Sequence, residues 1–163
     1  MRQFEYTSVT SFGEASAMLA RGNADILAGG TDLINVYKHA ILNESPASVV
    51  DLKTIPDAAG IVENEGSITV KALTRLTDVA ESPVLQRSAK ALADAAHSVA
   101  TPLIRNVGTI GGNICQDVRC WYYRYPHEIG GRMDCSRKGG ATCYALQGLS
   151  LIHISEPTRR SYI

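Results

Sequence analysis

Short runs of apolar residues with regular spacing mark out the elements of the first third of the chain. Residues 4–9 alternate apolar and polar side chains, which predicts a strand. Residues 11–22 open with a Ser-x-x-Glu capping box and close near a glycine, and the apolar residues between recur at helical spacing, which predicts a helix. The apolar runs at 25–28 and 48–52 predict two more strands, with a helix over 33–39 between them.

Similar patterns continue through the middle of the chain. Two apolar stretches, 61–62 and 68–73, flank the Glu-Gly pair at 65–66, which is typical of a hairpin turn. Thr77 is expected to cap a short helical turn. A longer helix is predicted over 83–99, because it opens with a proline and its apolar residues follow at helical spacing.

The predicted strand at 25–28 leads directly into a glycine turn. Gly29 and Gly30 come first, Thr31 and Asp32 follow, and then the predicted helix begins. Such a turn presents free N–H groups and the positive end of a helix dipole, which favours an anion such as phosphate. In the alternative interpretation, Thr31 or Asp32 is an ordinary helix cap. The spacing is not G-x-G-x-x-G, so the Rossmann fingerprint is absent.

A second turn of the same kind lies far downstream, within residues 101–120. Gly111 and Gly112 lack a Cβ, so their N–H groups can approach a large anionic ligand closely. The Asn113 amide and the Thr109 hydroxyl can point at the same oxygens. Double glycines also occur in ordinary turns, and a binding role is favoured only because a matching turn lies upstream and cysteines follow.

Composition excludes several classes of protein. The 163 residues are the length of one domain, and 45% apolar with 20% charged residues is typical of a globular protein. Sixteen basic and sixteen acidic residues cancel, so the net charge does not favour nucleic acid or a membrane surface as a partner. We expect no transmembrane segment and no secretory signal, and hence a cytoplasmic chain whose cysteines are thiols or metal ligands rather than disulfides.

All four cysteines lie within residues 115–143, with the spacing C-x4-C-x14-C-x7-C, which indicates a shared role. An iron–sulfur cluster tolerates such long loops, whereas structural zinc usually shows two C-x2–4-C knuckles, and this sequence does not have such a pair of knuckles. A set of inert thiols is the third interpretation. The loop is also net positive, which suits an anionic four-thiolate cluster. Its basic residues are Arg119, Arg124, Arg132, Arg137 and Lys138.

Two motifs, LAGGTDL at 27–33 and IRNVGTIGGN at 104–113, together resemble the flavin subunit of the molybdenum hydroxylases. This family includes xanthine dehydrogenase, aldehyde oxidoreductase and hydroxybenzoyl-CoA reductase. The resemblance implies an α+β fold of the molybdopterin dehydrogenase flavoprotein type (PCMH-like), in which two subdomains clasp FAD between them.

The resemblance also sets expected boundaries. It implies an FAD-binding domain over 1–148, with a first subdomain at about 1–55 and a second at about 56–148 that includes the cysteine loop 115–143. Residues 149–163 resemble translated sequencing-adapter DNA instead. We therefore expect a non-native tail on a C-terminally truncated domain.

By this resemblance the two motifs hold FAD between them. The backbone from Ala28 to Leu33 wraps the pyrophosphate, and the second turn forms a wall beside the flavin. The implied FAD-binding residues are Leu27, Ala28, Gly29, Gly30, Thr31, Asp32, Leu33, Thr109, Gly111, Gly112 and Asn113. No catalytic residue is expected, because no histidine has an evident nucleophile or carboxylate partner and the chemistry belongs to the cofactor.

The cysteine loop narrows the resemblance. The stretches CQDVRCWYYR, CSRKGG and TCYAL are similar to those family members whose flavin subunit carries an extra [4Fe–4S] cluster. The match implies Cys120, Cys135 and Cys143 as ligands. In such relatives the fourth ligand lies further downstream, where this chain has no cysteine, so Cys115 is the remaining candidate.

The resemblance implies an electron-transfer subunit of a larger oxidoreductase. Substrate reacts at a molybdenum centre on a large subunit, electrons cross [2Fe–2S] clusters on a small subunit, and FAD in this chain passes them to an external acceptor. Such a subunit is cytoplasmic unless it is exported to the periplasm with a partner. Two alternatives stay open: a nonenzymatic zinc or iron–sulfur redox-sensing module, and an oxidase of the related FAD fold that works alone. The first glycine turn has no histidine for covalent flavin attachment, which weakens the second.

Overall fold

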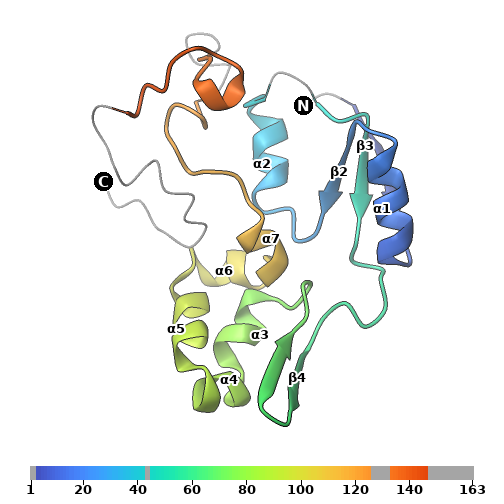
Figure 1. Ribbon diagram of the computed structural model, residues 1–163, viewed down its shortest axis with the longest axis vertical. Helices are drawn as coiled ribbons and strands as arrows, with labels where there is room; N and C mark the ends of the chain where they lie inside the picture. The colour runs from blue at the N-terminus through green and yellow to red at the C-terminus, as the bar shows by residue number, and fades with distance from the viewer. Residues whose placement is uncertain (1–2, 43–44, 126–132, 147–163) are drawn as a thin grey trace.

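The first group of elements is a three-stranded parallel sheet with two helices. The structure is a computed structural model, and it describes residues 3–42, 45–125 and 133–146. The group comprises β1 (Glu5–Ser8), α1 (Phe12–Ala20), β2 (Ala24–Leu27), α2 (Leu33–Lys38) and β3 (Ser48–Asp51). The strand order is β1-β3-β2, and α1 and α2 lie in the connections that parallel strands require (Figure 1).

Burial explains why β3 occupies the centre of this sheet. Val49 and Val50 are fully buried, as expected for an apolar pair in a parallel strand covered on both faces. The capping box of α1 also forms: the Glu14 N–H donates to the Ser11 hydroxyl oxygen at 3.1 Å. The strands and helices predicted for this part of the chain are confirmed, with ends that differ by one or two residues.

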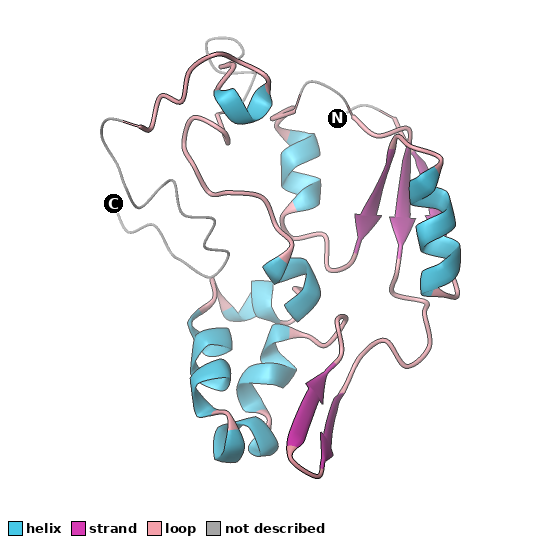
Figure 2. Ribbon diagram, viewed as in Figure 1, coloured by secondary structure: helices cyan, strands magenta, loops and turns pink. Residues whose placement is uncertain are grey.

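The second group of elements is a β-hairpin with four helices. It comprises β4 (Ile61–Asn64), β5 (Ser67–Val70), α3 (Leu76–Glu81), α4 (Pro83–Ser88), α5 (Lys90–Ser98) and α6 (Pro102–Arg105). Figure 2 shows the helices gathered beside the hairpin. Their buried core consists of Leu76, Val79, Ala80, Leu85, Ala93, Ala96 and Val99.

Two local predictions fail in this group, although the hairpin turn is confirmed, with Gly66 at φ 77°. The single helix predicted over 83–99 is wrong. The backbone leaves the helical region at Ala89 (φ −146°, ψ 51°), which lets α5 pack along α3. Thr77 does not cap α3, because Arg75 occupies the N-cap position and no side chain caps this helix.

The chain after residue 108 returns from the second group to the first. A short helix, α7 (Ile110–Ile114), lies at the junction, and the 3-10 helix η1 (Ser136–Lys138) lies near α2 (Figure 1). Leu42, just beyond α2, packs against Val118, Tyr123 and Cys135. The described part of the cysteine loop therefore covers the sheet-bearing group rather than the helical one.

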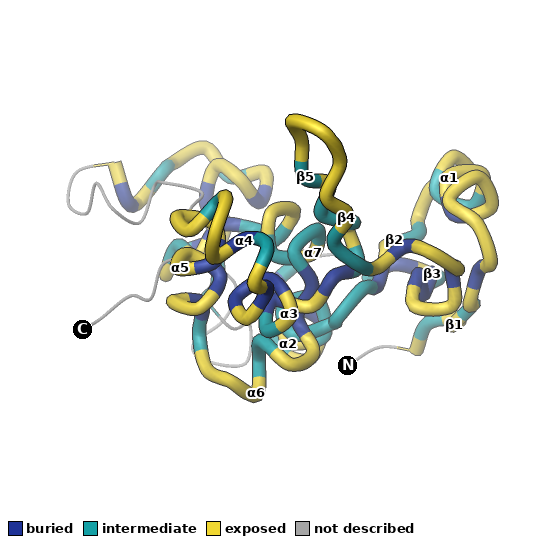
Figure 3. Tube along the Cα trace, turned by 90° about the horizontal axis from the view of Figure 1, so that it is seen from below, coloured by how far each residue is buried: buried dark blue, intermediate teal, exposed yellow. Residues whose placement is uncertain are grey.

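Burial is concentrated where the elements meet. Figure 3 shows buried residues along β3 and α3, while the tip of the hairpin is exposed. Within the described ranges, no helix has the length and apolar character needed to cross a membrane.

Candidate functional site

The two glycine turns, far apart in sequence, lie against each other. A Cβ built on Gly29 falls 2.4 Å from the carbonyl oxygen of Val107, closer than real Cβ atoms approach backbone. A Cβ built on Gly111 falls 2.8 Å from the carbonyl oxygen of Ala72. Glycine is therefore required at both positions because backbone from another segment occupies the space of a side chain.

The first turn presents a run of free backbone donors. The N–H groups of residues 29–33 donate no hydrogen bond to any atom in the part of the chain that the structure describes. Gly30 has a φ of 73°, and its carbonyl oxygen accepts from the Ile34 N–H at 3.2 Å, at the start of α2. Asp32 stands at the N-cap of α2, but its side chain does not cap the helix. Consecutive N–H groups of this kind form a site for an anion.

In the second turn, the glycine N–H groups that were expected to face an anionic ligand are bonded within the chain. The Gly111 N–H donates to the Ala72 carbonyl oxygen at 2.9 Å, and the Gly112 N–H donates to the Thr109 hydroxyl oxygen at 3.1 Å. Thr109 thereby caps α7. The Asn113 side-chain oxygen accepts from the Gln116 amide at 2.9 Å. Because both glycine N–H groups are used within the chain, the glycines of the second turn offer a closely packed wall rather than free backbone donors.

A cavity of about 1260 Å³ lies between the two turns. This volume exceeds the roughly 300–1,000 Å³ of ordinary small-molecule sites, so the cavity suits a large ligand. The predicted residues that line it are Ala28, Gly29, Gly30, Thr31, Asp32, Leu33, Thr109, Gly111, Gly112 and Asn113. Leu27 does not line it and is buried in the core beside Val36.

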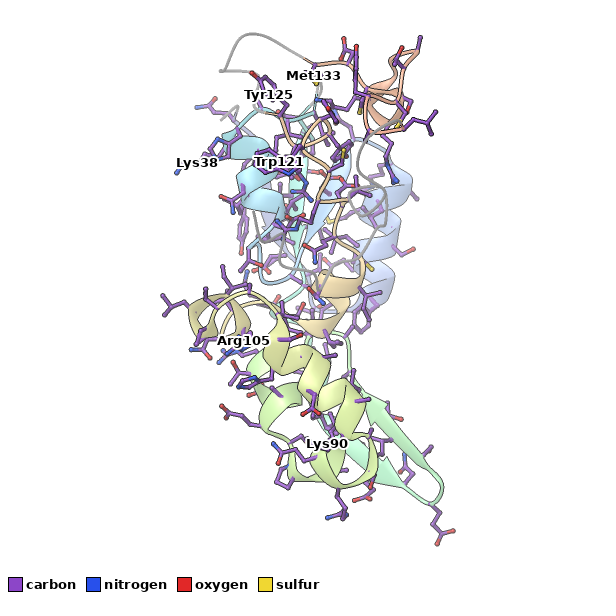
Figure 4. The ribbon with its side chains drawn as sticks, turned by 90° about the vertical axis from the view of Figure 1, so that its left-hand side faces the viewer. Lys38, Lys90, Arg105, Trp121, Tyr125 and Met133 are labelled. Carbon is purple, nitrogen blue, oxygen red and sulfur yellow. The ribbon has the colours of Figure 1, made fainter. Side chains whose placement is uncertain are left out.

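A third wall, which sequence reasoning missed, comes from residues 115–125. Its Trp121 and Tyr125 line the cavity, and Figure 4 shows both near α2, well away from Arg105 of α6. Arg119 and Arg124 line it as well. The positive charge of the loop is a sequence signal for Arg119 and Arg124, but it suits an anionic metal cluster equally well.

The carboxylate of Asp32 fixes this third wall to the first turn. Arg124 donates two hydrogen bonds to it, from Nη1 to Oδ1 at 2.8 Å and from Nη2 to Oδ2 at 2.9 Å. Arg119 Nη1 lies 3.3 Å from the same Oδ1. The pKa of Arg119 is lowered, mainly because the side chain is partly buried. The negative charge of Asp32 opposes this shift, and the positive charge of Arg124 adds to it.

The other two carboxylates that line the cavity accept hydrogen bonds from tyrosines. The Tyr37 hydroxyl donates to Asp25 at 2.5 Å, and the Tyr123 hydroxyl donates to Asp117 at 2.7 Å. Burial raises the pKa of both tyrosines well above its usual value, and the hydrogen bond to the carboxylate raises it further. Both phenols therefore stay protonated and act as donors.

The four cysteines do not form a metal site in this arrangement. Cys115 is exposed at the end of α7 and lines the cavity. Cys120 packs against the small apolar cluster that contains Cys135, and Cys143 directly follows Thr142, which forms a β-bridge with Cys135. In the described ranges, no three side chains of His, Cys, Asp or Glu converge on a possible metal position. The arrangement does not fit a four-thiolate cluster, and this cluster stays a prediction.

Comparison with known proteins gives a consistent match over the first three quarters of the chain. Residues 2–120 match the model of the family described as "FAD binding domain in molybdopterin dehydrogenase". The carbon monoxide dehydrogenase medium chain of Hydrogenophaga pseudoflava is 38% identical over 69% of this chain and 39% of its own length. The xanthine dehydrogenase FAD-binding subunit of Escherichia coli O157:H7 is 38% identical over 68% of this chain and 38% of its own length.

One relative also aligns with the cysteine loop. The aldehyde oxidoreductase FAD-binding subunit of Escherichia coli K12 is 30% identical over 94% of this chain and 46% of its own length. This alignment extends well past residue 120, where the family match ends.

Solved structures show the same fold. Carbon monoxide dehydrogenase from Hydrogenophaga pseudoflava superimposes with a TM-score of 0.66 at 37% identity, over 69% of this chain and 39% of that one. Quinoline 2-oxidoreductase from Pseudomonas putida 86 gives 0.63 at 27% identity, over 69% of this chain and 39% of that one. The α+β fold expected from the resemblance is confirmed, and the chain spans about two fifths of the length of these relatives.

Proposed function

Because the chain belongs to the family of FAD-binding domains in molybdopterin dehydrogenases, we propose that it binds FAD in the cavity between its two glycine turns. It would thereby act as the flavin-bearing part of a molybdenum-dependent oxidoreductase. The observation that carries this proposal is the run of free N–H groups at residues 29–33, at one side of a cavity whose volume is large enough for a dinucleotide.

Each wall of the cavity has its own part in holding the cofactor. The N–H groups of the first turn, at the start of α2, bind the pyrophosphate, which carries two negative charges. The second turn, from Thr109 to Asn113, lies against the flavin half and excludes water there. When bound, FAD supplies the two-electron chemistry, and the protein supplies binding and orientation.

Partners and compartment extend the same proposal. A large subunit with the molybdenum centre and a small subunit with [2Fe–2S] clusters would deliver electrons, and an external acceptor would take them from the flavin. We place this complex in the cytoplasm. A nonenzymatic metal-binding module has less support, because the described cysteines do not converge.

Titration of the chain with FAD tests the proposal. FAD should bind with quenching or a spectral change of the flavin, whereas riboflavin, which has no pyrophosphate, should bind at least about tenfold more weakly because it cannot reach the N–H groups of the first turn. A chain that binds no FAD contradicts the proposal. Equal affinity for riboflavin and FAD contradicts the role given to residues 29–33.

A further inference from the structure

Asp32 places a negative charge where the proposed pyrophosphate binds. Its own N–H belongs to the free donors of the first turn, yet its side chain, which is 17% exposed, places a carboxylate at the same end of the cavity. Asp25 and Asp117 add two further carboxylates to the lining. Without cations, such a lining repels an anion.

Arg124 donates four hydrogen bonds, two of them to the Asp32 carboxylate and two to backbone carbonyl oxygens. Besides the bidentate pair with the carboxylate, its Nε donates to the Val118 carbonyl oxygen and its Nη2 to the Asp117 carbonyl oxygen, both at 2.8 Å. Only 15% of the side chain is exposed. A planar guanidinium held in this way keeps its charge and its position.

Arg119 approaches the same carboxylate more loosely. Its side chain is 51% exposed, its Nη1 lies 3.3 Å from Asp32, and its Nη2 donates to the Gln116 side-chain oxygen at 2.6 Å. Arg119 and Arg124 are the cationic side chains among the described residues that line the cavity. The formal charges of Arg119, Arg124 and Asp32 alone sum to one positive unit, so this group of three does not repel an anion.

We propose that Arg124 and Arg119 neutralise Asp32 so that the first turn can accept the pyrophosphate of FAD. This inference rests on the proposed function. It assigns a positioning role to Arg124, which lies beyond the family match at residues 2–120.

The variant R124M tests the inference with two ligands. Losing the bidentate partner leaves Asp32 with Arg119 alone, so the dissociation constant for FAD should rise on the order of tenfold or more. Riboflavin carries no pyrophosphate, and its affinity should stay within about threefold of the value for the unchanged chain. A purely structural contact would instead weaken both ligands together.

Rescue by a second substitution separates charge from packing. In D32N/R124M the unpaired carboxylate is gone, so FAD affinity should return to within about threefold of the unchanged chain. D32N alone should bind FAD at least as tightly as the unchanged chain, because two cations then face the pyrophosphate. Loss of FAD affinity in D32N, or failure of the double variant to recover it, overturns the inference.

Two further variants guard against misfolding and unspecific effects. R119M removes a half-exposed side chain with one ion pair, so it should fold and weaken FAD binding by roughly twofold to tenfold. R87M breaks the exposed pair between Arg87 and Glu63, outside the cavity, and should leave FAD affinity unchanged. If the unchanged chain binds FAD, and the variants R124M and R119M bind FAD with the same affinity as the unchanged chain, then this inference alone fails. If the unchanged chain binds no FAD, the proposed function fails with it.

Discussion

At the scale of single residues, Gly29 shows how a missing Cβ lets two distant segments meet. The carbonyl oxygen of Val107 occupies the position where any other residue would place its side chain. Gly13, in the first turn of α1, has no such neighbour, since the nearest heavy atom to its built Cβ is the Ser11 Oγ at 3.9 Å. The two glycines therefore differ in what they permit, although the sequence alone does not separate them.

The substitution Gly29→Ala should force the two turns apart. We expect a loss of about 1–3 kcal/mol in the free energy of unfolding, because a methyl group must displace backbone, together with a loss of FAD affinity. Urea unfolding and an FAD titration measure the two effects. The matched control, Gly13→Ala, should be neutral or stabilising by up to about 1 kcal/mol, because alanine favours the helix. Equal behaviour of the two variants would contradict the close approach at Gly29.

At the scale of elements, Asp51 joins β1 to β3. It lies at the end of β3 with 3% of its surface exposed, accepts a hydrogen bond from the Tyr6 hydroxyl of β1, and pairs with the Lys53 ammonium at 2.9 Å. Burial alone raises the pKa of this carboxyl. The hydrogen bonds from Tyr6 and Lys53 and the charge of Lys53 outweigh burial, so the pKa is lowered.

This lowered pKa predicts an acid-sensitive sheet. In the unfolded chain an aspartate has a pKa of about 3.9. The stabilisation from Asp51 is therefore fully present above this pH, and it is lost as the pH falls through the lower pKa that the carboxyl has in the folded chain. Asp51→Asn should cost about 1–3 kcal/mol at neutral pH and flatten the loss of stability below about pH 5. Urea unfolding at a series of pH values measures both. Glu63→Gln, which breaks an exposed surface pair, is the control and should change the free energy of unfolding at neutral pH by less than about 1 kcal/mol.

The elements also show where sequence patterns suffice. The strands and the capping box of α1 depend on residues close in sequence, so periodicity predicts them. The break at Ala89 has no such signal, because alanine is a good helix former and the break serves packing of α5 on α3. The prediction that the Gly111 N–H is free to bind a ligand is wrong for the same reason. This N–H donates to the carbonyl oxygen of Ala72, which lies in another segment.

At the scale of the whole molecule, the proposed cofactor lies between parts that are distant in sequence. The cavity is lined by the first turn, the second turn and the 115–125 segment. A ligand that contacts all three stabilises the folded chain through binding.

Saturating FAD should therefore raise the stability of the chain as one unit. At a free concentration of about one hundred times the dissociation constant, the free energy of unfolding should increase by about 2.7 kcal/mol. Far-UV circular dichroism during urea unfolding, with and without FAD, measures this increase. Riboflavin at the same concentration should give a smaller increase. An unchanged midpoint at saturating FAD would mean that the ligand does not bind the folded state preferentially.

The sequence by itself determined the elements of the sheet, the two glycine motifs and the family to which they belong, because each depends on residue types at short, regular spacings. Only the tertiary structure decided which N–H groups are free and which are already bonded, that Leu27 faces the core, and that Arg124 pairs with Asp32. The physical reason is that these features depend on contacts between segments up to 92 residues apart, and a local pattern carries no information about which segments meet.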